Sequence, residues 1–146
     1  MAIASGSSRM SRLAQARVAD AMHPGVLTCS SDTPLRDAAR IMVTHHVHAV
    51  VVGDAPALGA RPQWRLLSGL DLVAAALEGR LDERTVGEAT TSAAVTIGAD
   101  DTVANAARLM LEHGTAHVLV LGNQTGRPAG VLSSLDIAGL AAWGEA

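Results

Sequence analysis

The second half of the sequence repeats the first. When the chain is shifted by 68 positions, residues 18–52 align with residues 86–120, and 11 of the 35 aligned residues are identical. Near the end of each copy the shift falls to 65, because residues 53–64 hold three extra residues. That stretch is rich in Gly, Pro and Ala, which is typical of a loop. A repeat of this length indicates a duplicated small domain rather than a solenoid of short units.

Both copies show the same order of apolar patterns. Runs of β-branched and aliphatic residues predict strands, and apolar residues at helical spacing predict amphipathic helices. The order is β-α-β-β-α in each copy, so the sequence predicts an α/β (α+β) fold made of two such repeats. The expected strands are residues 26–28, 50–52, 65–68, 94–96, 118–121 and 130–133, and the expected helices are residues 35–43, 70–77, 103–111 and 135–142.

The duplication also sets the expected domain organisation. Residues 1–17 are predicted to form an N-terminal tail with a short helix, residues 18–80 the first repeat, and residues 86–143 the second. Because neither copy covers its sheet well by itself, we expect the two repeats to pack together. The first helix is expected to have Thr33 as its N-cap and Pro34 at its first position, and Asp101 is expected to cap the equivalent helix.

Composition argues against several classes of protein. A net charge of −3, the absence of Lys and the presence of only two aromatic residues argue against nucleic-acid binding. No apolar run approaches the length that a membrane span needs. The single cysteine, Cys29, excludes an internal disulfide, so we expect a cytoplasmic protein in which Cys29 is an inert apolar side chain.

The feature that the copies share most clearly is Ser-x-x-Asp between a strand and the following helix. The motif is Ser68-x-x-Asp71 in the first copy and Ser133-x-x-Asp136 in the second. It has two interpretations. A serine N-cap followed by an acid is close to a capping box, which stabilises a helix start by about 1 kcal/mol. The same geometry presents backbone N–H groups to an anion and a carboxylate to two ribose hydroxyls.

Residues near this motif are further candidates for a ligand site. Gly130 would let a ligand approach the backbone in the second copy, where the first copy has Arg65. Thr33 can donate a hydrogen bond to a phosphate, whereas Asp101 would repel a phosphate.

Three of the six histidines, His45, His46 and His48, are close together in the sequence. No second cluster of Asp, Glu or Cys completes a tetrahedral set, so we expect no metal site. His48 and His117 are better candidates for anion contacts, or are ordinary surface residues. The sequence contains no pair of nucleophile and base and no common catalytic motif, so we do not expect an enzyme.

Taken together, these patterns resemble a tandem cystathionine β-synthase (CBS) domain pair. The resemblance rests on the duplicated β-α-β-β-α unit, on Val-x-x-x-Met (Val18–Met22) ahead of it, and on Gly-h-h-Ser-x-x-Asp (Gly130–Asp136; h, hydrophobic) before its last helix. It covers residue 18 to about residue 143, which implies a stand-alone pair without an attached enzyme or channel. It also implies repeats packed about a pseudo-two-fold axis, two clefts for adenosine-type ligands, and a flat homodimer.

The resemblance further implies roles for single residues. The aspartates of the two Ser-x-x-Asp motifs would bind ribose hydroxyls, and the serines would lie near the phosphate. His48 and His117 would fall where the γ subunit of the AMP-activated kinase carries basic pairs that meet phosphate. The opposite repeat would complete each cleft: Thr33 and Ala38 would face the Asp136 cleft, and Asp101 and Ala106 would face the Asp71 cleft.

The two copies differ, and the difference favours one cleft. Arg65 in place of Gly, Asp101 in place of Thr and a longer loop weaken the Asp71 cleft, so we expect the Asp136 cleft to be the better site. The expected function is a homodimeric regulatory sensor, without a cofactor, that binds an adenine nucleotide or another adenosyl ligand and acts on an unknown protein target. The alternative is a ligand-free dimerisation module in which the Ser-x-x-Asp motifs are only helix caps.

Overall fold

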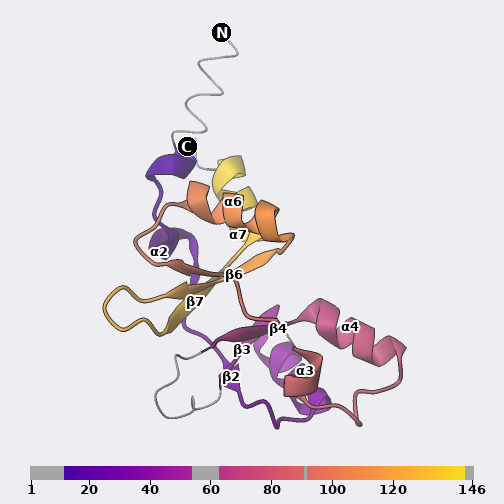
Figure 1. The fold of residues 1–146 in the computed structure, drawn as a ribbon. Coiled ribbons are helices and arrows are strands. Elements are labelled where there is room, and N and C mark those ends of the chain that lie inside the picture. Colours follow the sequence, from indigo (N-terminus) through magenta and orange to yellow (C-terminus); the bar gives the residue numbers. More distant parts are fainter. Residues whose placement is uncertain (1–11, 54–62, 91, 144–146) are drawn as a thin grey trace. The chain divides into compact units, whose positions relative to one another are not determined.

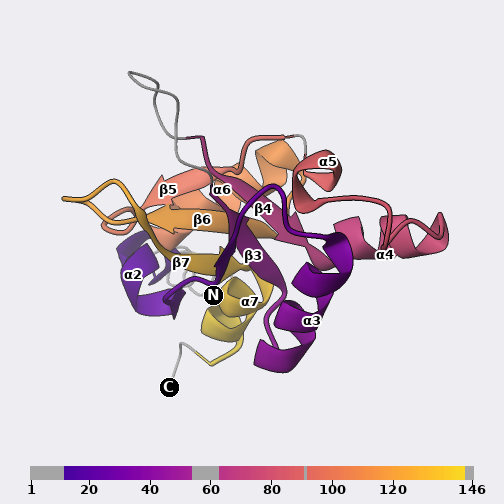
Figure 2. The same ribbon diagram turned by 90° about the horizontal axis from the view of Figure 1, so that it is seen from below.

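The computed structural model describes residues 12–53, 63–90 and 92–143. The chain divides into two units (Figure 1). The central unit is Val26–Ala94, and the terminal unit combines Met1–Gly25 with Val95–Ala146. Each unit holds a mixed β-sheet with helices packed on it (Figure 2), which confirms the predicted α/β fold. Of the predicted N-terminal tail, residues 12–15 are helical and residues 1–11 lie outside the described residues.

The central unit is built on a three-stranded sheet in the order β2-β3-β4, with β2 parallel and β4 antiparallel to β3. Its strands are β2 (Thr28–Cys29), β3 (Ala49–Val52) and β4 (Arg65–Ser68), and its helices are α3 (Leu35–His45), α4 (Gly69–Leu77) and α5 (Val86–Ala89). An apolar core lies between the sheet and the helices. Its buried side chains are Leu35, Ala38, Met42, Val50, Val52, Leu67, Ala75 and Val86, with Cys29 packed against them.

The terminal unit repeats this arrangement with one more strand, in the order β1-β7-β6-β5. Its strands are β1 (His23–Pro24), β5 (Thr96–Gly98), β6 (His117–Leu121) and β7 (Pro128–Ser133), and its helices are α2 (Val18–Ala21), α6 (Val103–His113) and α7 (Ser134–Trp143). The buried core is made of Val18, Ile97, Ala99, Ala106, Met110, Val118, Val120 and Leu132.

The elements of the two units match the sequence duplication. Helices α3 and α6 each contain 11 residues and begin 68 positions apart. The first strand of each copy starts later than predicted from the apolar runs at residues 26–28 and 94–96. The apolar runs begin before the strands because Leu27 and Val95 take part in the parallel pairing only through their carbonyl groups. Each of these carbonyls accepts a backbone hydrogen bond from the neighbouring strand.

The two units do not coincide with the sequence repeats 18–80 and 86–143. Residues 18–25, at the start of the first repeat, pack in the terminal unit, and residues 86–94, at the start of the second repeat, pack in the central unit. Val18 and Val86 occupy equivalent positions, and both are fully buried in these cores. Each repeat therefore completes the core of the other repeat with its leading segment.

The N-cap of the first helix in each copy lies one residue later than predicted. The N-caps are Pro34 and Thr102, so the prediction of Thr33 and Asp101 as N-caps is wrong. Pro34 stays extended because it forms a β-bridge with Thr85, and a matching bridge from Arg17 holds Thr102. Each bridge pairs the cap with a distant segment, which the local pattern does not reveal.

In the part of the chain that the structure describes, no helix is long and apolar enough to cross a membrane.

Candidate functional site

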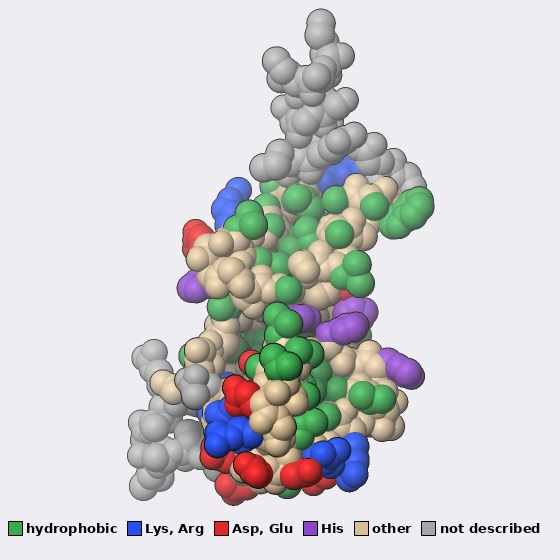
Figure 3. Space-filling model, turned by 90° about the vertical axis from the view of Figure 1, so that its right-hand side faces the viewer, with side chains coloured by type: hydrophobic (Ala, Val, Ile, Leu, Met, Phe, Trp, Pro, Cys, Tyr) green, Lys and Arg blue, Asp and Glu red, His purple; other side chains and the backbone are tan. Residues whose placement is uncertain are grey.

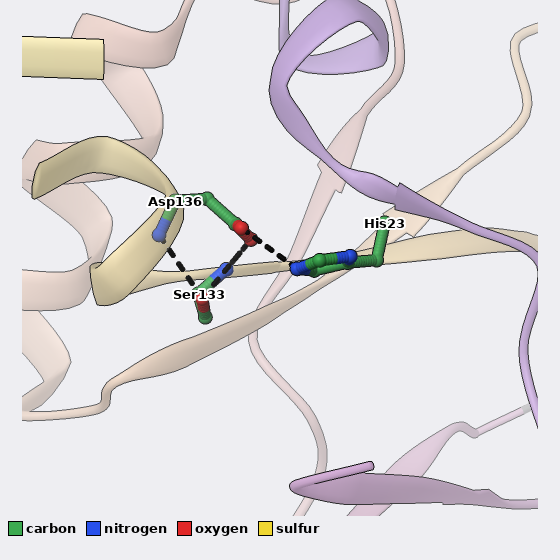
Figure 4. Close-up of polar contacts among 3 residues, drawn as sticks. All are labelled: His23, Ser133 and Asp136. Carbon is green, nitrogen blue, oxygen red and sulfur yellow. Dashed lines mark hydrogen bonds and ion pairs between the residues drawn. The ribbon is translucent and has the colours of Figure 1, made fainter. Parts of the chain in front are cut away.

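The second Ser-x-x-Asp motif lies where β7 ends and α7 begins (Figure 4). The backbone N–H and the hydroxyl of Ser133 donate to Oδ2 of Asp136 at 2.8 and 3.0 Å. In return, the backbone N–H of Asp136 donates to Oγ of Ser133 at 3.2 Å. These bonds close a capping box, so the capping interpretation of this motif is confirmed. Its ligand-binding interpretation stays a prediction.

The first Ser-x-x-Asp motif has the same place at the turn from β4 to α4. The backbone N–H of Ser68 donates to Oδ2 of Asp71 at 2.8 Å, and the hydroxyl of Ser68 is 3.2 Å from the same oxygen. Each unit therefore has an aspartate carboxylate at the N-terminal end of the helix that follows its last strand. In both units, the N–H and the hydroxyl of a serine hold this carboxylate.

Asp136 has a further partner that the sequence analysis missed. Nε2 of His23 lies 2.9 Å from Oδ1 of Asp136 and forms an ion pair when the imidazole is protonated (Figure 4). The Asp136 side chain is 12% exposed and the His23 side chain is 80% exposed. β1 brings the imidazole there because it pairs antiparallel with β7 and places His23 opposite Val131. The Pro after His23 suits an edge strand, but the sequence does not show which strand β1 joins.

Gly130 lets β1 approach β7 closely. A Cβ atom on Gly130 would lie 2.4 Å from the carbonyl oxygen of His23 and 2.7 Å from Sδ of Met22. Any larger residue would therefore collide with the backbone of β1. The sequence predicts that a ligand approaches the backbone at Gly130. On the side of Gly130 that faces β1, the protein itself fills that space.

Arg65 occupies the equivalent position in the central unit. Its Nη1 donates to the carbonyl of Thr90 at 2.5 Å and to that of Gly87 at 3.4 Å. The guanidinium group thus caps carbonyls at the C-terminal end of α5, where a cation also interacts favourably with the helix dipole. At this position, Gly130 of the terminal unit leaves room for β1, whereas Arg65 of the central unit binds the C-terminal end of α5.

His117 lies beside the serine of the terminal motif. It is directly opposite Ser133 in the pairing of β6 with β7, so the two side chains leave the same face of the sheet. In the central unit, Ala49 is opposite Ser68, and His48 lies one residue before β3 and is exposed. A histidine thus flanks the motif within the sheet only in the terminal unit.

The remaining predicted site residues have structural roles within their own units. Ala38 and Ala106 are fully buried in the two cores. The Thr33 hydroxyl shares a hydrogen bond with a serine three residues earlier. Oδ1 of Asp101 accepts from the following backbone N–H at 2.8 Å and from the side-chain amide of Asn105 at 2.6 Å, which orders the first turn of α6.

The clustered histidines are spread over a helix end. His45 is the last residue of α3, and His46 caps it with a φ of 54°, in the left-handed region. Within residues 12–53, 63–90 and 92–143, no group of three or more His, Cys, Asp or Glu side chains is placed to hold a metal ion.

Two β-α-β-β-α units, each with a capped carboxylate after its last strand, define a duplicated α/β module. The CBS domain family matches residues 18–57 and 86–142, so the chain belongs to the CBS domain family. The two matched segments make it a tandem pair of CBS domains. A search of curated protein sequences gave no match.

Solved structures with the same fold include other CBS domain pairs. The CBS domain pair of protein MJ0100, in complex with 5′-methylthioadenosine and S-adenosyl-L-methionine, has a TM-score of 0.74 at 22% identity, covering 89% of this chain and 98% of that one. The CBS domain protein PAE2072 from Pyrobaculum aerophilum, complexed with AMP, has a TM-score of 0.72 at 24% identity, with 89% and 99% covered. The hexameric CBS-CP12 protein from bloom-forming cyanobacteria has a TM-score of 0.78 at 19% identity, with 88% and 73% covered.

Proposed function

We propose that this protein is a regulatory module that binds an adenosyl ligand, such as AMP, at the start of α7. The observation that carries the proposal is the carboxylate of Asp136, which is nearly buried and held at a helix N-terminus beside His117. A carboxylate accepts hydrogen bonds from ribose hydroxyls, and a helix N-terminus with a basic neighbour favours a phosphate. The proposed role is regulatory rather than catalytic.

Two similar proteins support the class of ligand. One was solved with AMP and the other with 5′-methylthioadenosine and S-adenosyl-L-methionine. These ligands share an adenosine group and differ at the 5′ position. A site built on a ribose-binding carboxylate fits that shared part, so we propose adenosine as the element that this protein recognises.

The Asp136 position is proposed as the stronger of two sites. His117 lies next to this motif, whereas Ala49 takes its place beside Ser68. A basic side chain near the helix start strengthens the attraction of a phosphate group. A role for Thr33, Ala38 and His48 in binding stays a prediction.

Self-association is the second part of the proposal. Helix α4 exposes Leu70 (79%) and Leu77 (88%), and helix α7 exposes Leu135 and Trp143. Hydrophobic side chains reach the surface of both units in the view of Figure 3. Exposed apolar side chains along a helix mark an interaction surface, and one similar CBS protein is hexameric. We therefore propose a homodimer formed through these helices.

Thermal unfolding with adenosine, AMP, ADP, ATP, NADH and S-adenosylmethionine tests the proposed function. A ligand at about 100 times its dissociation constant stabilises the folded state by about 2.7 kcal/mol. We expect a higher melting temperature with at least one of these compounds, and a loss of the shift in Asp136→Ala. Asp71→Ala is the matched variant, because it removes the equivalent carboxylate. The absence of a shift with every compound would contradict the proposal.

A ligand-free interaction module is the second candidate. It is favoured by the two capping boxes, in which the protein itself uses Oδ2 of each aspartate. This candidate predicts that Asp71→Ala and Asp136→Ala lower stability by similar amounts, as the loss of a helix cap does, and that neither changes any ligand response.

A further inference from the structure

The hydrogen bonds of Asp136 leave little room for a ribose. An ionised carboxylate has about four acceptor positions on its two oxygens. In Asp136, three of these are used: two by the N–H and the hydroxyl of Ser133 on Oδ2, and one by His23 on Oδ1. Two ribose hydroxyls need two acceptor positions, and one is left.

The contact with His23 is the one that can be released. The bonds from Ser133 join residues three positions apart and hold the start of α7, so they are part of the helix cap. His23 is on the edge strand β1 and its side chain is 80% exposed, so the imidazole has space to turn toward solvent. When it turns, both acceptor positions of Oδ1 become available.

We propose that His23 competes with the ligand for Oδ1 of Asp136, so that adenosine binds only when His23 releases this oxygen. This inference rests on the proposed function and adds its regulation. Asp71 provides the internal comparison, because its Oδ1 has no hydrogen-bond partner among the residues that the structure describes. Competition of this kind is therefore specific to the terminal unit.

The competition makes ligand binding depend on pH. Histidine side chains ordinarily change charge between about pH 5 and pH 8. A protonated His23 holds the carboxylate by a charge-assisted hydrogen bond, which is stronger than the bond from the neutral imidazole. Adenosine must therefore displace a stronger partner at low pH, and its affinity decreases as the pH falls.

Few other charged groups bear on His23. β7, which pairs with β1, has no titratable side chain, and Asp136 is the one titratable group of α7. Helix α2, which precedes β1, carries the exposed Asp20. On β6, His117 lies opposite Ser133, which bonds Asp136, so it is the other titratable side chain close to the pair.

Calorimetric titration with adenosine at about pH 5 and about pH 8 tests the proposal across the range in which histidine titrates. Adenosine is used because it has no phosphate that a charged imidazole would attract. All proteins carry Asp71→Ala, so that the central unit does not contribute. The reference keeps His23, the test variant is His23→Ala, and the matched control is His113→Ala, an exposed histidine at the end of α6.

We expect adenosine to bind roughly two- to fivefold more weakly at the lower pH in the reference protein and in His113→Ala, the range for an ion pair with one exposed partner. In His23→Ala, the pH difference disappears and binding at the lower pH becomes tighter. A pH difference that persists in His23→Ala, or that is missing in the reference, overturns the proposal while the proposed function stands. No binding of adenosine at either pH, in these proteins or in the wild type, overturns both.

Nuclear magnetic resonance gives a readout that does not depend on affinity. The imidazole signals of His23 are expected to shift on addition of adenosine and to shift in the same direction in Asp136→Ala. Signals that do not respond to either change would show that His23 does not compete for this carboxylate.

Discussion

His46 and Gly114 occupy equivalent positions at the ends of α3 and α6, and both have left-handed backbone, with φ of 54° and 60°. Glycine adopts this conformation freely, whereas another residue is strained there by roughly 1–2 kcal/mol. His46→Gly should therefore raise the free energy of unfolding by about 0.5–1 kcal/mol, and Gly114→Ala should lower it by about 1 kcal/mol. Urea unfolding of both variants measures whether the two changes in the free energy of unfolding have opposite signs. Changes of the same sign would contradict this prediction.

Gly130→Ala should loosen β1 from β7. The new methyl group would meet the carbonyl of His23, which is backbone and cannot turn aside. We expect a loss of about 1–3 kcal/mol in unfolding free energy, which is typical of overpacking. Gly139→Ala in α7 is the control, since nothing lies within 4 Å of a Cβ there, and it should gain about 0.5–1 kcal/mol from better helix propensity. An unchanged unfolding free energy in Gly130→Ala would show that β1 does not lie close against β7.

The capping box at the start of α5 should make stability depend on pH. Hydrogen bonds from the backbone N–H and the hydroxyl of Thr85 hold the pKa of Glu88 below its ordinary value of 4.5. A carboxyl with a lowered pKa in the folded state stabilises the protein above the unfolded pKa and loses this effect as the pH falls through the folded pKa. Below about pH 4.5, the melting temperature should therefore fall less in Glu88→Gln than in the wild type. Glu112→Gln, an exposed carboxyl on α6, should behave as the wild type does.

Replacement of apolar side chains on α4 should shift the protein toward the monomer. Leu70 and Leu77 are exposed in the single chain, and burying them against a second copy would gain roughly 25 cal/mol per Å² of apolar surface. Leu70→Gln with Leu77→Gln should lower the dimer fraction in sedimentation experiments over a range of concentrations. The exposed Val43 of α3, changed to Gln, controls for a general loss of surface hydrophobicity. A wild-type protein that sediments at 14.9 kDa throughout would contradict the proposed dimer.

The sequence predicted the features that depend on local pattern. The duplicated order of strands and helices follows from apolar periodicity, and a helix cap formed by Ser133 and Asp136 is one of the two interpretations of the motif, because both residues lie within one helical turn. The features that it missed depend on distant pairing. The exact helix start at Pro34 depends on a bridge to Thr85, and the contact of His23 with Asp136 depends on which strand β1 joins. The side-chain pattern of a strand of two residues is too short to predict which strand it pairs with.

The exchange of leading segments has a consequence for the order of events during synthesis. The central unit is contiguous and has all its residues once residue 94 has left the ribosome, whereas the terminal unit must wait for β7 before β1 can pair with it. Residues 18–25 therefore leave the ribosome before the central unit, but they can pack in the terminal unit only after β7 has followed. Contacts this distant in sequence slow folding, so we expect the central unit to fold before the terminal unit as the chain emerges.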